Sequence, residues 1–184
     1  MTVEPLPSNP ELQSLQQHPH RPVVWVGGAM DNYTQLLKRH CGPNQHYFQW
    51  FQRRELARWL QAQQQMALLI GHSYGACTAA SVVASGIAVA ALVTIDPVSW
   101  RKPAGAAVRR HATHWHNYVA GDQQLNWANI VARAGGQWCH WPAQHAHQHQ
   151  VLPADHATVV AAVLQIWRPQ IAVFASQVPD SSAL

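Results

Sequence analysis

One short stretch of this sequence combines a nucleophilic side chain with a turn that would expose it. Gly71-His72-Ser73-Tyr74-Gly75 has the G-x-S-x-G pattern, follows the apolar run Met66–Ile70 and precedes a run of small residues, 76–85, that is typical of a helix. On a sharp turn between a strand and a helix, the serine hydroxyl is presented, and the helix N-terminus offers N–H groups to a developing oxyanion. G-x-S-x-G strings also occur by chance in turns, but in this context the pattern predicts acyl transfer through Ser73.

A serine nucleophile needs a histidine that takes its proton and a carboxylate that orients the histidine. The chain has 13 histidines but only 8 acidic residues, so the acid is the more restrictive choice. Two acids follow strand-like runs beyond the serine, Asp96 and Asp122, and both could lie at the same edge of a parallel sheet. The other six lie in the tails, before the serine or beside a histidine: Glu4, Glu11, Asp31, Glu55, Asp155 and Asp180.

The elements that must position these residues alternate between strands and helices. Strands are expected at Val23–Val26, Tyr47–Phe51, Met66–Ile70, Ala90–Ile95 and His114–Ala120, with a possible sixth at Gln137–Trp141. Helices are expected from Asp31, over Arg53–Gln65, over Ala76–Ser85 and over Thr158–Trp167, the last stopped by Pro169. This alternation predicts an α/β fold, a single domain with a mostly parallel sheet of about six strands and helices on both faces.

Four segments make the chain resemble the α/β-hydrolase superfamily, in particular its lipase/esterase-like serine hydrolases, over roughly Val23 to Trp167. They are Val24–Met30, Gly71–Gly75, Leu92–Val98 and Asp155–Val159. The resemblance implies the chain order serine, acid, histidine, with the histidine just before the final helix, where His156 stands. The alternative for His156 is a helix-start residue beside a capping Asp155.

The resemblance leaves two acids open. The superfamily usually places its acid after the second strand beyond the nucleophile, which favours Asp122. Some lipases place it one strand earlier, in a segment that resembles Thr94–Pro97. We expect Asp96, because Pro97 fixes the backbone after the carboxylate, whereas Asp122 stands in a polar turn where it could bond its own backbone.

The resemblance also implies an oxyanion hole made by the N–H groups of Tyr74 and Ala29. Gly27 stands where the family has a histidine, so Gly28 or Met30 is the alternative second donor. Gly28, Met30 and His72 are expected at the substrate site, although His72 is often a packing residue in the family.

An aromatic pocket with a cationic border is expected near the serine. Trp100 and Trp141 would form its apolar part, and Arg101 and Lys102 its border. Such a pocket would suit a substrate that is apolar at one end and anionic at the other.

Composition excludes several other classes of protein. With 184 residues, 48% hydrophobic residues and 9 tryptophans, the chain can bury a core, so a disordered protein is excluded. The 12 Lys and Arg residues give a net charge of +4 but are scattered, which argues against a nucleic-acid partner. Three widely spaced cysteines without a Cys-x-x-Cys pair, and the lack of a signal-like or bilayer-spanning apolar run, favour a cytoplasmic protein without an integral membrane segment. We expect an N-terminal arm (1–21), the hydrolase domain (22–168) and a C-terminal tail (169–184); the oligomeric state stays open.

A histidine-rich segment offers a competing function. His140, His145, His147 and His149 lie near Cys139, and alternate residues of a strand would share one face. Since no acidic ligand is near in sequence, we expect adventitious metal affinity and no metal or organic cofactor.

The leading hypothesis is a serine hydrolase of a small acyl ester or thioester; the alternatives are a catalytically silent hydrolase-fold binding module and a histidine-rich metal-binding protein.

Overall fold

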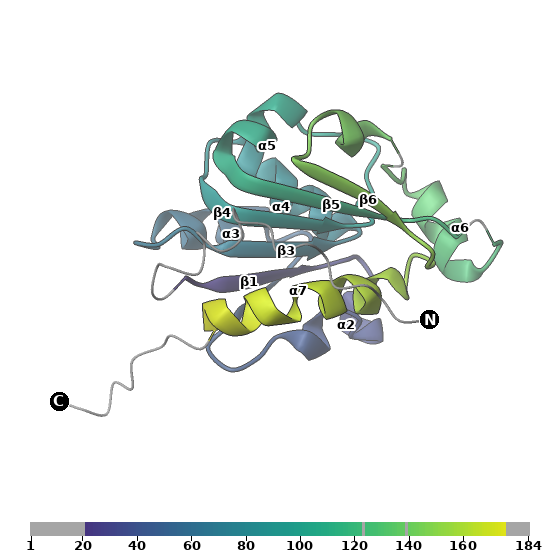
Figure 1. The fold of residues 1–184 in the computed structure, drawn as a ribbon, viewed down its shortest axis with the longest axis horizontal. Helices are drawn as coiled ribbons and strands as arrows, with labels where there is room; N and C mark the ends of the chain where they lie inside the picture. Colours follow the sequence, from purple (N-terminus) through teal and green to yellow (C-terminus); the bar gives the residue numbers. More distant parts are fainter. Residues whose placement is uncertain (1–20, 123, 139, 176–184) are drawn as a thin grey trace.

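One parallel sheet lies between two layers of helices (Figure 1) in the computed structural model, which describes residues 21–122, 124–138 and 140–175. The strand order is β2-β1-β3-β4-β5-β6, and every neighbouring pair is parallel. The strands are β1 (Val23–Gly27), β2 (His46–Gln49), β3 (Leu68–His72), β4 (Val89–Ile95), β5 (Ala112–Ala120) and β6 (Gln148–Leu152). The predicted α/β class and its six-stranded parallel sheet are therefore confirmed.

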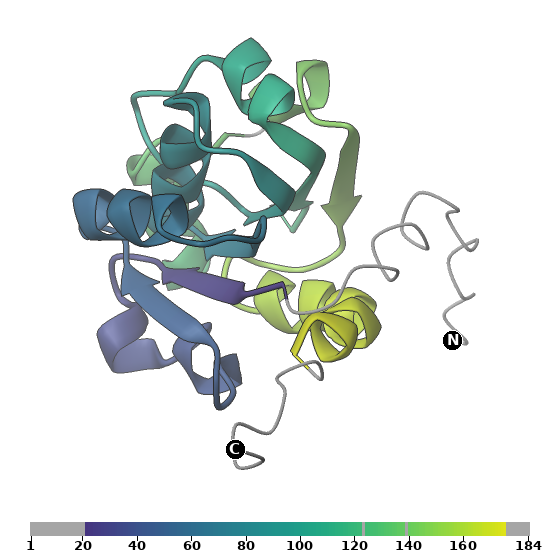
Figure 2. The ribbon, with the colours of Figure 1, turned by 90° about the vertical axis from the view of Figure 1, so that its left-hand side faces the viewer.

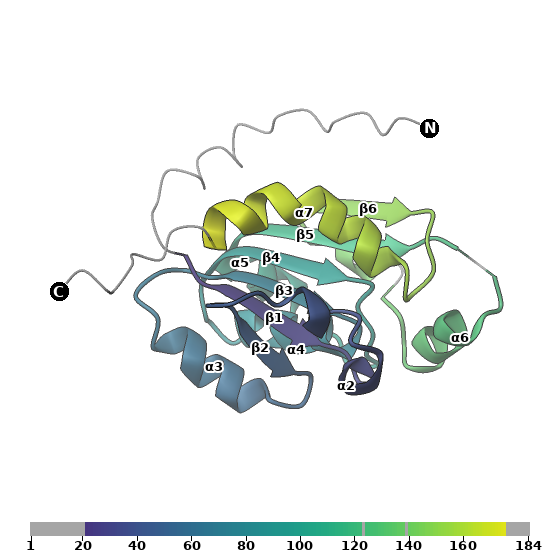
Figure 3. The same cartoon turned by 90° about the horizontal axis from the view of Figure 1, so that it is seen from below.

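The two helical layers cover opposite faces of the sheet, as Figures 2 and 3 show. Successive residues of a strand point to opposite faces, so Trp25 packs in the core on the side of α7, and Val26 packs with residues of α3 and α4. The helices are α2 (Asp31–Thr34), α3 (Arg53–Gln61), α4 (Tyr74–Ala84), α5 (Gly105–His111), α6 (Trp127–Ala134) and α7 (Val159–Ala175), with 3₁₀ turns at Lys38–His40 and Trp141–Gln144. Burial on both faces explains why strands such as β1 and β4 are almost entirely apolar.

The parallel arrangement brings the carboxyl ends of all six strands to one edge of the sheet. Ser73 follows β3, Asp96 follows β4 and His156 follows β6, so three segments far apart in the sequence meet at this edge. We call it the carboxyl edge below.

The expected sixth strand at Gln137–Trp141 is wrong. The described residues of that segment make only an isolated antiparallel bridge, between Val98 and Gln137, and a 3₁₀ turn begins at Trp141. The sixth strand is β6, inside the histidine-rich segment, and it pairs with β5 at the edge of the sheet. An edge strand leaves side chains exposed, and β6 buries only Leu152, so its polar composition hid it from a search for apolar runs.

Several helix ends also differ from expectation. Helix α3 ends at Gln61 and not at Gln65. The final helix does not stop at Pro169 but continues to Ala175. Ile171 and Phe174, beyond the proline, pack against the core, and this burial offsets the cost of one missing N–H donor. The predicted N-terminal arm (apart from Arg21) and the end of the C-terminal tail, residues 176–184, lie outside the described residues.

The helix that begins at Asp31 is only one turn long. The Asp31 carboxylate is buried and accepts hydrogen bonds from the N–H groups of Leu37 (2.8 Å) and Lys38 (3.0 Å) and from the hydroxyl of Tyr47 (2.6 Å). Burial and the bond to Asp31 raise the pKa of the Tyr47 hydroxyl, which therefore stays protonated as a donor. Asp31 thus ties the loop after β1 to β2.

No helix among the described residues is both long and apolar enough to cross a bilayer.

Candidate active site

Ser73 lies on the turn between β3 and α4 in a strained backbone conformation. Its φ is 57° and its ψ is −129°, in a region that side chains other than glycine rarely adopt. A Cβ at Gly71 would stand 2.7 Å from the Cα of Ala76, and one at Gly75 would stand 2.6 Å from the carbonyl oxygen of Gly27. Only glycine fits these two positions, so the turn holds the Ser73 hydroxyl at the carboxyl edge.

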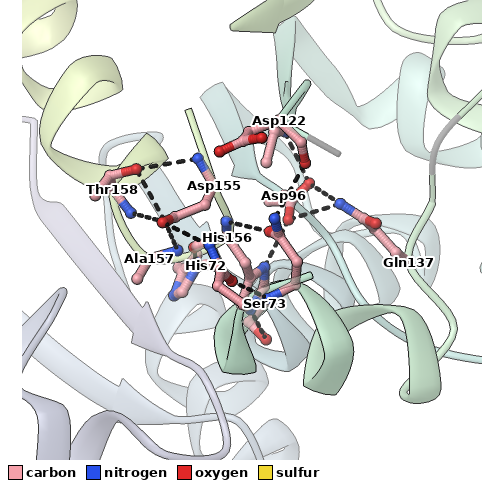
Figure 4. A network of polar contacts seen from close by, with 12 residues as sticks. His72, Ser73, Asp96, Asp122, Gln137, Asp155, His156, Ala157 and Thr158 are labelled. Atoms are coloured by element: carbon pink, nitrogen blue, oxygen red, sulfur yellow. Dashed lines mark hydrogen bonds and ion pairs between the residues drawn. The ribbon is translucent and has the colours of Figure 1, made fainter. Parts of the chain in front are cut away.

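His156 connects this hydroxyl to a carboxylate (Figure 4). Its Nε2 lies 3.1 Å from Oγ of Ser73, and its Nδ1 lies 2.6 Å from Oδ2 of Asp96. With Nδ1–H donating to the carboxylate, the lone pair of Nε2 faces the serine hydroxyl and can accept its proton. Ser73, Asp96 and His156 are each more than nine-tenths buried. Because little water reaches them, the charge that develops on the imidazole is stabilised mainly by Asp96.

Asp96 is fully buried at the end of β4, with a φ of 40°. Its Oδ1 accepts from the N–H of Ala120 at 3.0 Å, and the side-chain amide of Gln137 donates to Oδ1 and Oδ2 at 2.7 and 2.8 Å. These donors stabilise the ionised carboxylate and fix its orientation toward His156.

Asp122 lies at the same edge, but its carboxylate serves its own turn. Its Oδ1 accepts from the N–H of Gln124 at 2.9 Å. Of the two acids that the sequence left open, the structure brings Asp96 to His156.

The segment that carries His156 is held by the asparagines of α6. Oδ1 of Asn129 accepts from the N–H of His156 at 3.0 Å, while its Nδ2 donates to the carbonyl oxygens of Asp122 (3.1 Å) and Gln124 (2.9 Å). Oδ1 of Asn126 caps α6 by accepting from the N–H of Asn129. The Asn126 amide also donates to Oδ2 of Asp155 at 3.1 Å, so Asp155 and His156 each have a partner at the N-terminal end of α6.

Asp155 itself behaves as the expected cap. Its Oδ1 accepts from the N–H groups of Ala157 (2.9 Å) and Thr158 (2.7 Å) just before α7 (Figure 4). Although burial disfavours its charge, the hydrogen bonds from Thr158, Ala157 and Asn126 lower the pKa of Asp155 below its usual range.

His72 forms a hydrogen bond with the backbone of His156. Burial lowers the pKa of His72 to about 4, so the ring is neutral, and its Nε2 donates to the carbonyl oxygen of His156 at 3.0 Å. The ring is buried and its bond goes to backbone, which corresponds to the packing role and not to the substrate contact expected for it.

The loop after β1 approaches the nucleophile at Gly28. A Cβ there would lie 2.8 Å from Cβ of Ser73, so the loop can come this close only with glycine. Ala29 and Met30 follow as exposed residues, and Tyr74 opens α4 directly after the nucleophile. The expected oxyanion donors, the N–H groups of Tyr74 and Ala29, thus belong to the two segments that flank Ser73.

The two tryptophans expected near the serine, Trp100 and Trp141, lie in different parts of the structure. Trp100 is 76% exposed and lies against Gly136, while Arg101 and Lys102 beside it are exposed. Trp141 instead packs on Trp115 and Trp138 in the helix-covered core.

The histidine-rich segment does not form a metal site in the part of the chain that is described. No group of three His, Cys, Asp or Glu side chains among those residues could hold an ion. Nδ1 of His147 accepts from the N–H of Trp115, Nδ1 of His149 bonds the amide of Asn117, and the ring of His145 packs on Trp141. The three expected on one strand face have separate partners because β6 begins only at Gln148.

Two supporting residues carry little signal in the sequence. Asn129 stands three residues after Asn126, a spacing that indicates a helix cap but says nothing of His156. Gln137 reaches Asp96 across 41 residues, and no local pattern marks it.

Comparisons with known proteins agree with this architecture. No protein-family model matches the sequence, and no curated protein does. The esterase domain of a Rhodothermus marinus protein superimposes with a TM-score of 0.51 and 18% identity, over 85% of this chain and 88% of that one. A YdeN-like hydrolase from Pectobacterium atrosepticum gives a TM-score of 0.49 and 19% identity, over 80% and 84% of the two chains. The thioesterase domain from the curacin biosynthetic pathway gives 0.46 and 10%, over 83% and 91%.

The identities are low, so the likeness concerns the fold. The similarity to the Rhodothermus domain spans most of both chains. The chain therefore has the α/β-hydrolase fold that its four sequence segments indicate.

Proposed function

We propose that this protein is a serine hydrolase that cleaves a carboxylic ester or thioester through an acyl-enzyme on Ser73. The observation that carries the proposal is the continuous hydrogen-bonded path from Oγ of Ser73 through His156 to Asp96, with distances of 3.1 and 2.6 Å. A path of this kind has the geometry of nucleophile, general base and orienting acid.

In the acylation step, Oγ of Ser73 attacks the carbonyl carbon while Nε2 of His156 takes the hydroxyl proton. The carbonyl oxygen becomes an oxyanion, for which we assign the N–H groups of Tyr74 and Ala29 as donors. When the tetrahedral intermediate collapses, the bond to the alcohol or thiol breaks, and the imidazolium returns the proton to that leaving group. Asp96 remains ionised and stabilises the imidazolium throughout.

Deacylation repeats the sequence with water as the nucleophile. His156 takes a proton from the water as it attacks the acyl carbon, and returns it to Oγ of Ser73 when the ester bond to the enzyme breaks. The products are the free acid and the regenerated serine, so the reaction consumes one water per ester and needs no cofactor.

The esterase domain whose fold resembles this chain supports the proposed reaction class. A silent binding module is the less favoured alternative, because it has no need for the strained Ser73 turn or for a buried carboxylate behind His156. A metal-binding function is disfavoured because the histidines of the histidine-rich segment bond different partners.

A fluorophosphonate probe tests the proposal, because it reacts only with an activated serine. We expect stoichiometric labelling of the full chain, complete loss in Ser73→Ala, and normal labelling in Ser85→Ala, whose exposed serine lies at the other end of α4. Turnover on a panel of p-nitrophenyl esters and acyl thioesters should follow the labelling. Absence of both labelling and turnover in protein with a native circular dichroism spectrum would reject the hydrolase and leave the silent module.

A further inference from the structure

The most exposed large apolar side chains of the described residues gather at the carboxyl edge. The five highest exposed fractions are those of Tyr33 (84%), Leu125 (80%), Trp127 (77%), Trp100 (76%) and Phe51 (61%). Isolated exposed apolar residues are ordinary, but a group of them on one side of a protein marks an interaction surface. Together with Ile130, we call these residues the apolar rim.

The order of the strands places the apolar rim on both sides of Ser73. Tyr33 follows β1, Phe51 follows β2, Trp100 follows β4 and the remaining three follow β5, whereas Ser73 follows β3. Figures 1 and 3 show α2 and α6 at the end toward which the strands run. A surface that binds the apolar rim would therefore also meet the proposed nucleophile.

Helix α6 exposes its large apolar side chains to solvent. Trp127, Ile130 and Val131 share its exposed side, whereas its buried residues are Asn129, which holds His156, and the small Ala132. A helix of a soluble domain normally turns its apolar face to the core. The outward apolar face of α6 therefore lacks a partner within the described residues, and a lipid interface would supply one.

Aromatic contacts connect the apolar rim to the nucleophile turn. The ring of Trp50 lies 5.9 Å from Phe51 and 5.5 Å from Tyr74, the residue after Ser73. The Tyr74 hydroxyl then donates to the carbonyl oxygen of Gly135 at the end of α6. The exposed aromatic residues thus belong to the same packed edge as the active-site turn.

Charge at this edge favours an anionic lipid surface over a second copy of the chain. Arg53 and Arg54 lie two and three residues after Phe51, Arg101 and Lys102 directly follow Trp100, and all four are exposed. Two copies that met through this edge would bring these cations together, and each chain has a net charge of +4. Lipid phosphates would instead pair with them, and Trp and Tyr side chains favour the boundary between acyl chains and headgroups.

We propose that the apolar rim binds the surface of an anionic phospholipid bilayer, and that the substrate is an acyl ester drawn from that surface. The substrate assignment rests on the proposed hydrolase, whereas the binding surface does not. The rim side chains enter the interface, the four cations contact the headgroups, and Ser73 faces the bilayer between them.

Flotation of the full-length Ser73→Ala chain with lipid vesicles tests binding without turnover. We expect binding to vesicles with 30% phosphatidylglycerol and little binding to pure phosphatidylcholine. Ile130→Ser combined with Trp127→Ser is expected to weaken binding about tenfold, since apolar contact with the interface is lost. Met66→Ser is the matched control, because Met66 is 42% exposed and Ile130 43% exposed, yet Met66 lies before β3 at the opposite edge.

The cations are tested in the same assay. Arg101→Gln with Lys102→Gln is expected to weaken binding to phosphatidylglycerol vesicles by about fivefold per charge, and less at high salt. Arg58→Gln with Arg110→Gln removes two exposed charges elsewhere and serves as the control. Equal losses in both pairs would mean that only net charge matters and would overturn the docking surface.

Other outcomes also decide the proposal. Equal vesicle binding by the rim variant and by Met66→Ser, or no binding by the Ser73→Ala chain, would overturn it. A dimer of the parent chain that the rim variant converts to a monomer, without vesicle binding, would show self-association instead and would also overturn it.

The substrate assignment has its own readout. We expect the unaltered chain to release fatty acid from phosphatidylglycerol vesicles, and the rim variant to lose more activity on vesicles than on a soluble short-chain ester. Vesicle binding without fluorophosphonate labelling would overturn the hydrolase and the lipid substrate while leaving the docking surface. Labelling without vesicle binding would overturn the docking surface and leave the hydrolase.

Discussion

Oδ2 of Asp96 lies 2.6 Å from Nδ1 of His156, and this contact joins the end of β4 to the segment before α7 across 60 residues. The carboxylate is fully buried, so water cannot replace it as a partner of the imidazole. Because Ala120 and Gln137 occupy its remaining acceptor positions, Asp96 presents one oxygen to His156 in a fixed direction.

This relationship predicts opposite outcomes for the two candidate acids. Asp96→Asn is expected to lower kcat by about 10⁴-fold on a p-nitrophenyl ester, because the amide cannot stabilise the imidazolium and favours the wrong imidazole tautomer. Asp122→Asn is expected to change kcat less than tenfold, because among the described residues its carboxylate bonds only its own turn. A large loss in Asp122→Asn with normal activity in Asp96→Asn would contradict the assignment.

Asp96 and His156 could be predicted from the sequence because each lies in a recognisable local segment. Thr94–Pro97 resembles a known acid segment, and His156 precedes a helix with clear apolar spacing. The local sequence does not give the distance between side chains. Asp96 and Asp122 both follow parallel strands, and only the packing of the segment before α7 decides which of them His156 contacts. The same limit explains why Gln137 was missed, since its contact depends on where a chain without regular structure crosses Asp96.

Gln137 is predicted to be a positioning residue for the acid. Gln137→Leu removes two hydrogen bonds to a buried carboxylate, each of which contributes about 1.5 to 3 kcal/mol when the partner is charged. We expect kcat to fall at least about tenfold with little change in KM, because the substrate does not need Gln137 to bind.

A conservative pair of variants separates positioning from general damage to the fold. Gln137→Glu keeps the shape but places a second carboxyl group beside Asp96, so its activity loss should grow as the pH rises and the new group ionises. Gln61→Leu, at the exposed end of α3, is the control for the Gln137→Leu exchange. A KM effect without a kcat effect in Gln137→Leu would contradict the positioning role.

Asn129 is predicted to couple α6 to the active site. Asn129→Leu leaves the N–H of His156 and the carbonyl oxygens of Asp122 and Gln124 without this partner, so we expect a loss of about 2 to 3 kcal/mol in the free energy of unfolding by urea. Because His156 loses its anchor, kcat should fall further than the unfolded fraction explains.

Asn126→Ala serves as the comparison for Asn129. It removes the cap of α6, a cost of about 1 kcal/mol, and the bond to Asp155, but keeps the bond between Asn129 and His156. The two variants should therefore differ in kcat more than in stability. Equal kcat values would show that α6 acts on stability alone.

The central strands of the fold were easier to predict than its edge strand and the end of its last helix. Central strands such as β3 and β4 are buried on both faces and appear as apolar runs, whereas β6 is covered on one side only and appears as a polar loop. Pro169 gives a correct local signal, but the burial of Phe174 outweighs it. Where tertiary packing and local propensity disagree, the sequence shows only the local preference.

Two buried histidines predict that the fold loses stability in mild acid. Burial lowers the pKa of His72 and of His116 to about 4, whereas in the unfolded chain both titrate near 6.5. As the pH falls below about 6.5, the unfolded state takes up protons that the folded state excludes, so the free energy of unfolding falls until about pH 4. Each histidine contributes a slope of up to about 1.4 kcal/mol per pH unit in this window.

His116→Leu isolates one of these contributions away from the active site. His116 packs its ring edge-on against Trp167, faces His114 and hydrogen-bonds Gln148. Among the described residues its buried Nδ1 has no hydrogen-bond partner, so leucine removes a titrating group at the cost of one hydrogen bond. Urea unfolding at pH 7, 6 and 5 is expected to show a smaller loss of stability in His116→Leu than in the parent chain, while His140→Asn, an exchange at an exposed histidine, follows the parent. If His116→Leu and the parent lose stability in parallel between pH 6.5 and 5, protonation of His116 does not limit the fold in acid, and the buried ring must titrate near its usual value.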